Sequence, residues 1–127
     1  MFHTSGASVA TGTALPLTPA LIGPNGTIVS QSPTEVYLAQ GHVYEVSYQV
    51  TASMAEAGGT FMIDPLLNAS PEVNYSTSAT VAQNGGSASV ASTFLVSSIS
   101  APNVLSLYYT GATAYSLGGV LVVREIA

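Results

Sequence analysis

The sequence contains no cysteine and no tryptophan, and Arg124 is its only lysine or arginine. Without cysteine, the chain forms no disulfide, no thiolate zinc site and no thiol nucleophile. With a single basic side chain it cannot neutralise a row of phosphates, so we expect neither nucleic acid nor a membrane surface as its partner. No run of residues approaches the roughly 18 apolar residues of a membrane-spanning helix.

Charge is scarce as well, because only 6% of the 127 residues are charged and the formal net charge is −5. A typical soluble domain carries roughly 25% charged residues. Serine, threonine, asparagine and glutamine must therefore cover the surface, and 12 glycines and 7 prolines supply the turns. The length suits one ordinary domain with its own core. We expect a single domain over residues 1–127, with residues 1–6 frayed at the terminus.

Turn signals recur at short intervals along the chain, as at Gly23–Gly26, Gly58-Gly59, Asn84–Gly86 and Gly118-Gly119. The segments between them have the length of strands, and a helix would need a longer stretch with 3.6-residue periodicity. There is no internal repeat and no Gly-X-Y period, which excludes a solenoid and a collagen triple helix within these residues. The pattern is typical of an antiparallel β-sandwich or barrel.

Two segments alternate between apolar and polar residues, as a strand with one buried face does. In residues 42–51 the apolar side chains are Tyr44, Val46, Tyr48 and Val50. Residues 72–83 repeat the pattern, with Val73, Tyr75, Thr77, Ala79 and Val81 on one face. Each segment is therefore predicted to be a half-buried strand.

Two further segments, residues 104–109 and 120–123, are apolar on both faces. A strand of a two-layer sandwich needs only one apolar face, and no helix is predicted that would cover the second. A single copy would expose a contiguous apolar patch. We therefore expect another copy of the chain to cover it, although short apolar runs also occur in any well-packed β core.

The order of these motifs resembles the BclA-type C-terminal domain of bacterial collagen-like exosporium proteins. The likeness rests on the Gly-x-Tyr strand within Val36–Val50, on Asn103–Tyr108 and on the ending Gly118–Ile126. That family belongs to the tumour necrosis factor and complement-head jelly-roll superfamily. The resemblance implies an all-β, antiparallel jelly-roll sandwich of about ten strands that forms a homotrimer, with one sheet around the threefold axis. It also implies an extracellular or spore-surface location, on the exosporium, and a collagen-like stalk, which this sequence does not contain.

The side chains that face the trimer axis follow from the alternation of each strand. In residues 104–109, Leu105, Leu107 and Tyr109 are the more apolar set and are assigned to the core. For the last strand, the likeness of its ending to the superfamily implies which residues face the axis. Together with the alternating strand, the predicted core includes Tyr44, Val46, Tyr48, Leu105, Leu107, Val120 and Val122. The predicted trimer interface consists of Val104, Ser106, Tyr108, Leu117, Leu121 and Val123.

Residues that could carry catalysis are few and scattered, so no enzyme, cofactor or metal site is predicted. His3 and His42 are the only imidazoles, and neither stands in a zinc or hydrolase motif. The carboxylates are isolated from one another in sequence, at Glu35, Glu45, Glu56, Asp64, Glu72 and Glu125. The leading interpretation is a non-catalytic trimerisation head that sets the register of a stalk and presents an outer surface.

The alternative interpretation is a ligand-binding jelly roll, either an adhesin that recognises sugar or host protein or the tip of a phage tail fibre. Asn74 with Tyr75 is the one neighbouring pair that suits such a surface. Arg124 and Glu125 are adjacent and must point to opposite faces of a strand, so they cannot simply neutralise each other. Arg124 either pairs with a carboxylate elsewhere, in this chain or in another subunit, or is solvated, which is the more common outcome near a chain end.

Overall fold

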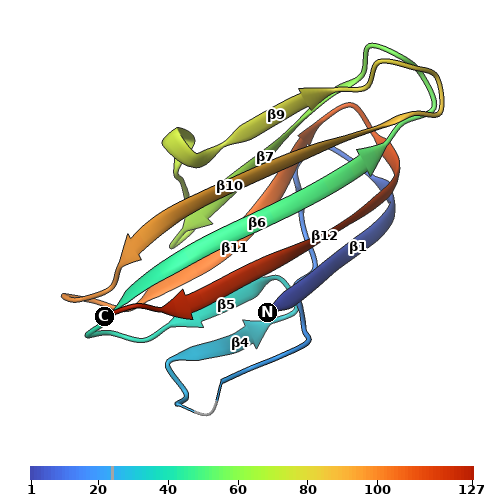
Figure 1. Ribbon diagram of the computed structural model, residues 1–127. Coiled ribbons are helices and arrows are strands. Elements are labelled where there is room, and N and C mark those ends of the chain that lie inside the picture. The colour runs from blue at the N-terminus through green and yellow to red at the C-terminus, as the bar shows by residue number, and fades with distance from the viewer. Residues whose placement is uncertain (24) are drawn as a thin grey trace.

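The computed structural model describes residues 1–23 and 25–127, and it is built almost entirely of antiparallel strands in two stacked sheets (Figure 1). Sheet A has the order β10-β6-β12-β1-β3. Sheet B has the order β4-β5-β11-β7-β8, with β2 beside β11 and β9 beside β7. The strands are β1 (Phe2–Val9), β2 (Thr13–Ala14), β3 (Thr18–Pro19), β4 (Ile28–Ser32), β5 (Glu35–Leu38), β6 (Val43–Ser53), β7 (Thr60–Leu67), β8 (Ser70–Pro71), β9 (Thr77–Thr80), β10 (Ser87–Ser97), β11 (Asn103–Gly111) and β12 (Ala114–Glu125), with one 3₁₀ turn, η1 (Val73–Tyr75).

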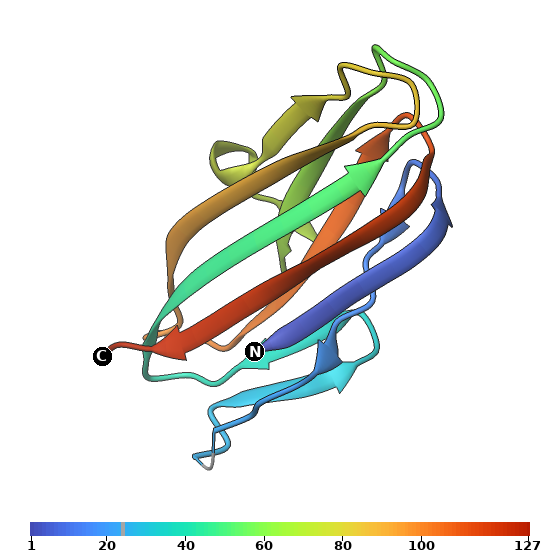
Figure 2. The ribbon, with the colours of Figure 1, turned by 45° about the vertical axis from the view of Figure 1, so that its right-hand side comes forward.

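The predicted all-β jelly-roll sandwich is therefore confirmed. The three longest strands, β6, β10 and β12, lie side by side in sheet A (Figure 1). β6 contains neither proline nor glycine, so its full length pairs with β10 without interruption. Figure 2 shows β1 alongside β12, on the side of sheet A away from β10.

The core lies between the sheets and takes alternate side chains from both. In β6, Tyr44, Val46 and Tyr48 are at most 2% exposed, as the alternation of this segment predicts. Leu105 and Leu107 of β11 face them from sheet B and are fully buried. These five residues lie where the sequence placed them.

The predicted orientation of β12 is wrong. Leu121 and Val123, expected at a trimer axis, are buried in the core of a single chain, as is Leu117. Val120 and Val122, expected in the core, point outward, and Val122 is 38% exposed. Because side chains alternate strictly along a strand, a one-residue error inverts every assignment. Residues 120–123 are apolar at every position, so the sequence pattern gave no way to choose.

The predicted interface is also divided between two surfaces. β11 lies in sheet B and β12 in sheet A, so the six interface residues do not share a face. Val104, Ser106 and Tyr108 alternate with the buried residues of β11 and point outward from sheet B. Ser106 is only 7% exposed, because the chain itself covers much of this side of β11.

Two smaller expectations are corrected as well. The first residues are not frayed, since Phe2 is fully buried and β1 pairs with β12 from Phe2 onward. Residues 72–83 form η1 and the short β9 rather than one long strand, and Val73 is 73% exposed. Within the described parts of the chain, no helix is long and apolar enough to cross a membrane.

Candidate functional site

The outer face of sheet A carries exposed aliphatic side chains among small polar ones. We call this surface face A and define it by the outward-pointing side chains of β6, β10 and β12 and the residue after β12. Leu95, Val122 and Ile126 are its most exposed aliphatic residues, at 56%, 38% and 45%. Around them lie shorter or uncharged side chains, namely Ser47, Gln49, Thr51, Ser89, Ala91, Thr93, Gly118 and Val120.

The hydroxyl groups of face A are paired across neighbouring strands. Ser47 Oγ lies 3.0 Å from Thr93 Oγ1, and Thr51 Oγ1 lies 2.6 Å from Ser89 Oγ. These pairs follow from the register, which places each serine directly opposite a threonine. Because the side chains are short and their hydroxyl groups satisfied, another surface can approach face A closely at a low desolvation cost.

The two formal charges on these three strands of face A neutralise each other. Arg124 Nε donates to Glu45 Oε1 at 3.0 Å, from the register position directly opposite. Glu125 points the other way, and its Oε1 lies 2.6 Å from Nδ1 of His42. The expected opposite orientation of Arg124 and Glu125 is thus confirmed, and the partner of Arg124 is a carboxylate of its own chain.

The outer face of sheet B is different in charge and in side-chain size. We call it face B and define it by the outward-pointing side chains of β5, β7 and β11. It carries two half-exposed tyrosines, Tyr37 and Tyr108, and two carboxylates, Glu35 and Asp64. Neither carboxylate forms an ion pair with any basic group in the described residues. Face B is therefore negatively charged.

A hollow of about 310 Å³ opens beside Asp64, between β7, η1 and β9. Its apolar walls are Met62 and Val73, and its polar lining comes from Asp64 and residues 76–78. A second hollow of about 270 Å³ lies on the same sheet and includes Tyr108. The sequence pointed to neither, since their residues come together only when β7 pairs with β9 and β11.

The predicted ligand residues Asn74 and Tyr75 lie in η1, next to the first hollow. Asn74 is exposed. The Tyr75 ring stacks on Phe94 with 4.3 Å between ring centroids, so one of its faces is occupied by packing. The role of Asn74 and Tyr75 in binding stays a prediction. The hollow beside them is a more defined concave surface than these two side chains themselves.

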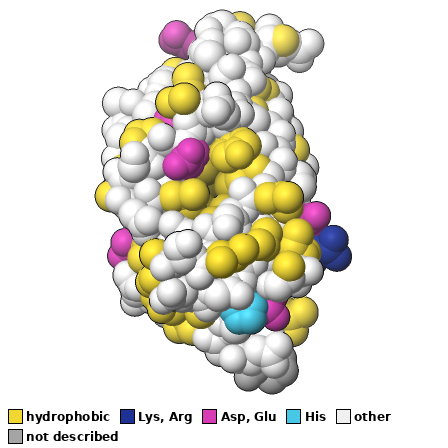
Figure 3. Space-filling model, turned by 90° about the vertical axis from the view of Figure 1, so that its left-hand side faces the viewer, with side chains coloured by type: hydrophobic (Ala, Val, Ile, Leu, Met, Phe, Trp, Pro, Cys, Tyr) yellow, Lys and Arg dark blue, Asp and Glu magenta, His cyan; other side chains and the backbone are white. Residues whose placement is uncertain are grey.

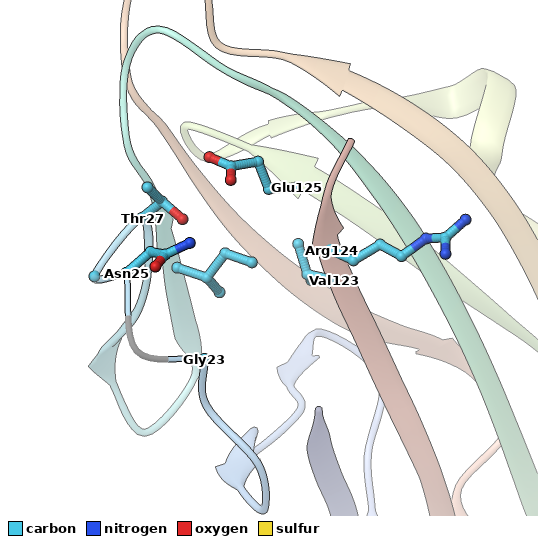
Figure 4. A pocket seen from close by; sticks show the side chains of 8 residues that line it. Gly23, Asn25, Thr27, Val123, Arg124 and Glu125 are labelled. Carbon is cyan, nitrogen blue, oxygen red and sulfur yellow. The ribbon is translucent and has the colours of Figure 1, made fainter. Parts of the chain in front are cut away.

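Another hollow, of about 260 Å³, lies between the loop before β4 and the end of β12 (Figure 4). The Glu125 carboxylate faces Thr27 and Asn25 across it, whereas the Arg124 side chain extends away from it. One oxygen of Glu125 lies 2.6 Å from His42 Nδ1. Among the described lining residues, only Glu125 points a charged side chain into the hollow. This arrangement ties the end of β12 to the turn before β6.

Hydrophobic side chains also gather on the narrow side of the sandwich where β9, η1 and the end of β10 lie (Figure 3). The exposed aliphatic residues of this region are Val73, Leu95 and Ile99, at 73%, 56% and 59%. Leu95 belongs to face A, so that apolar surface continues around the edge of the sheet. Single exposed aliphatic residues are normal, whereas larger contiguous apolar patches are typical of interaction surfaces and ligand-binding grooves.

Three buried tyrosines, Tyr44, Tyr48 and Tyr109, tie parts of the chain together. Burial raises the pKa of Tyr44, Tyr48 and Tyr109 above the ordinary value of 10.0. The Tyr48 hydroxyl donates to the carbonyl oxygen of Tyr75 at 2.7 Å and lies 2.8 Å from Thr77 Oγ1. Since Tyr48 is in sheet A and Thr77 in β9, this contact joins the two sheets.

No catalytic constellation comes together in the described residues. His3 lies in β1, opposite Val120, and His42 lies beside Glu125 at the end of β12. No group of three or more histidine, aspartate or glutamate side chains there is close enough to hold a metal ion.

The fold matches solved structures even though the sequence is distant from them. The globular domain of zebrafish complement 1qA protein aligns with 99% of this chain and 96% of its own, at a TM-score of 0.59 and 13% identity. The chain has a complement C1q-like jelly-roll fold. Rabbit GITRL aligns over 100% of this chain and 95% of its own, with a TM-score of 0.45 and 12% identity. No family model and no curated protein matches the sequence.

Proposed function

We propose that this chain is a non-catalytic head domain that assembles with two further copies of itself through face A and presents face B to solvent. Face A supports this proposal because it combines exposed Leu95, Val122 and Ile126 with paired hydroxyl groups and no net charge on its central strands. The number three rests on the BclA-type resemblance of the sequence.

The charges of the two faces favour face A as the surface of self-association. Copies that pack through the same surface bring its charges close together, and like charges in contact are destabilising. On face A the only carboxylate, Glu45, is paired with Arg124. On face B the carboxylates of Glu35 and Asp64 have no basic partner in the described chain, so self-association there would concentrate negative charge. Self-association through face A avoids that cost.

More specifically, we propose that the chain is the head domain of a bacterial collagen-like surface protein, located on the spore exosporium or elsewhere outside the cell. A trimer would hold three stalk chains together at one end and so set their register. The collagen-like stalk would precede this domain. The sequence motifs within Val36–Val50 and Gly118–Ile126 support this role.

Light scattering of the purified domain and of two charge variants tests the assembly. We expect the wild type to have the mass of three chains and Val122→Glu the mass of one, because the new carboxylate would be buried against another copy. Tyr108→Glu is the matched control on face B and should keep the wild-type mass. Circular dichroism of both variants verifies that each is folded.

A wild type with the mass of one chain at micromolar concentration would overturn the assembly itself. Dissociation by Tyr108→Glu but not by Val122→Glu would move the interface to face B. The alternative role, a ligand-binding jelly roll, is favoured by a separate observation, the hollow beside Asp64. The two roles are compatible because they use different faces.

A further inference from the structure

The hollow beside Asp64 has the size and the lining of a small-molecule site. Its volume of about 310 Å³ falls at the lower end of the range of about 300–1,000 Å³ for such sites, enough for one ring-sized ligand. It is formed by β7, with Met62 and Asp64, and by the later stretch of chain that runs from η1, with Val73, through residues 76–78 into β9.

The Asp64 carboxylate is held in place by hydroxyl groups of two other elements. Ser76 Oγ donates to Oδ1 at 2.7 Å, and Thr110 Oγ1 donates to Oδ2 at 3.2 Å. A carboxylate offers about four acceptor positions, so each oxygen can accept a further hydrogen bond. A ligand in this hollow must therefore bring a donor, and an anionic ligand would meet unpaired negative charge.

The apolar walls of the hollow favour a ligand that also has an apolar surface. Val73 is 73% and Met62 is 39% exposed, so both leave aliphatic area in water. Ser78 at the rim is exposed, and its hydroxyl group can both donate and accept. An ammonium group would donate to Asp64 but could accept nothing from Ser78. A purely apolar molecule would leave the remaining acceptor positions of Asp64 unused.

A sugar ring meets all of these requirements at once, because its hydroxyl groups donate and accept while its C–H bonds form an apolar surface. We propose that the hollow between β7, η1 and β9 binds one ring of a neutral saccharide, with Asp64 as the hydrogen-bond acceptor and Val73 and Met62 against the ring. This inference rests on the proposed function in one respect, since the hollow must stay open to solvent when face A is covered.

Titration with simple neutral sugars, followed by NMR, tests the site directly. The probes are the methyl glycosides of glucose, galactose, mannose and N-acetylglucosamine, with butylammonium as the cationic probe. We expect at least one glycoside to shift signals of β7 and β9, and its affinity to fall at least about tenfold in Asp64→Asn, which keeps the shape but loses an acceptor. Glu35→Gln, the matched control on the same face, should bind as the wild type does.

Three results would overturn the proposal. They are no shift with any glycoside at millimolar concentration, equal affinity in Asp64→Asn, and shifts with butylammonium alone, which would make this a site for cations. The mass of each variant, measured in parallel, separates the two proposals. If the wild type is a single chain and binds sugar, the saccharide site is supported and the assembly is overturned. If the wild type is a trimer and no glycoside shifts its signals, the assembly is supported and the saccharide site is overturned.

Discussion

Face A and face B belong to sheets that share one core, yet their outward halves are chemically different. Face A is short-chained, hydroxylated and neutral on its central strands, with Leu95 and Val122 exposed. Face B carries tyrosines, unpaired carboxylates and two hollows. The first composition suits contact with a copy of the same chain, and the second suits a ligand of a different kind.

This difference shows where a sandwich has freedom to carry function. The inward side chains of both sheets must fill one interior, so they are similar in kind, as Val46 and Leu107 illustrate. The outward side chains do not have to fill that interior. Their chemistry therefore reports the use of each face rather than the requirements of the fold.

The strongest test of which side chains of β12 belong to face A is Leu121→Ala. Leu121 is fully buried, so its truncation should lower the free energy of unfolding by about 2–5 kcal/mol. Denaturant unfolding at several protein concentrations measures the loss, which should not depend on concentration. Val122→Ala is the control, and its smaller loss should shrink as the protein is diluted, because it acts only through contact between copies, which dilution removes. Equal losses in the two variants would contradict the inward and outward assignments.

A second test uses the adjacent glycines of β12, at which an added Cβ would lie on opposite sides of sheet A. A Cβ at Gly119 would collide with the backbone of Gln49 and Val50, whereas a Cβ at Gly118 meets nothing within 4 Å. Gly119→Ala should therefore cost about 1–3 kcal/mol in the free energy of unfolding. Gly118→Ala should unfold at the same temperature as the wild type when both are followed by thermal unfolding. A tolerated Gly119→Ala would mean that β6 and β12 pair in another register.

The smallest expected effect concerns Tyr48, which joins the sheets. Tyr48→Phe removes its hydroxyl contacts with Tyr75 and Thr77, at a cost of about 1 kcal/mol. Because burial raises the pKa of Tyr48 in the folded state, its contribution is fully present below the ordinary value of 10.0 and is lost as the pH rises above that value. Denaturant unfolding between about pH 8 and pH 11 should show a steeper alkaline loss in the wild type than in the variant. Parallel curves would exclude this role of Tyr48.

Much of the fold could be predicted because its signals are local. Turn residues at short intervals and the scarcity of charge indicated an antiparallel sandwich, and the alternation of residues 42–51 placed Tyr44, Val46 and Tyr48 in the core. Such patterns depend only on the period of a strand and on the need to bury one side of it.

The candidate sites could not be predicted in the same way. Asp64, Ser76 and Thr110 are far apart in the chain and meet only through the pairing of β7 with β11 and the turn at η1. The apolar character of residues 104–109 was read as a trimer contact, but β11 lies centrally in sheet B and the chain itself covers part of its outer side.

By itself, then, the sequence determined the all-β class, the alternation of β6 and the lack of a clustered catalytic motif, because each depends on composition or on neighbours along the chain. Only the tertiary structure decided that β11 and β12 lie in different sheets and that Leu121 rather than Val122 is buried. A strand that is apolar on both sides carries no local signal of its orientation. Its partners across the sheet and across the core fix that orientation, and they are distant in sequence.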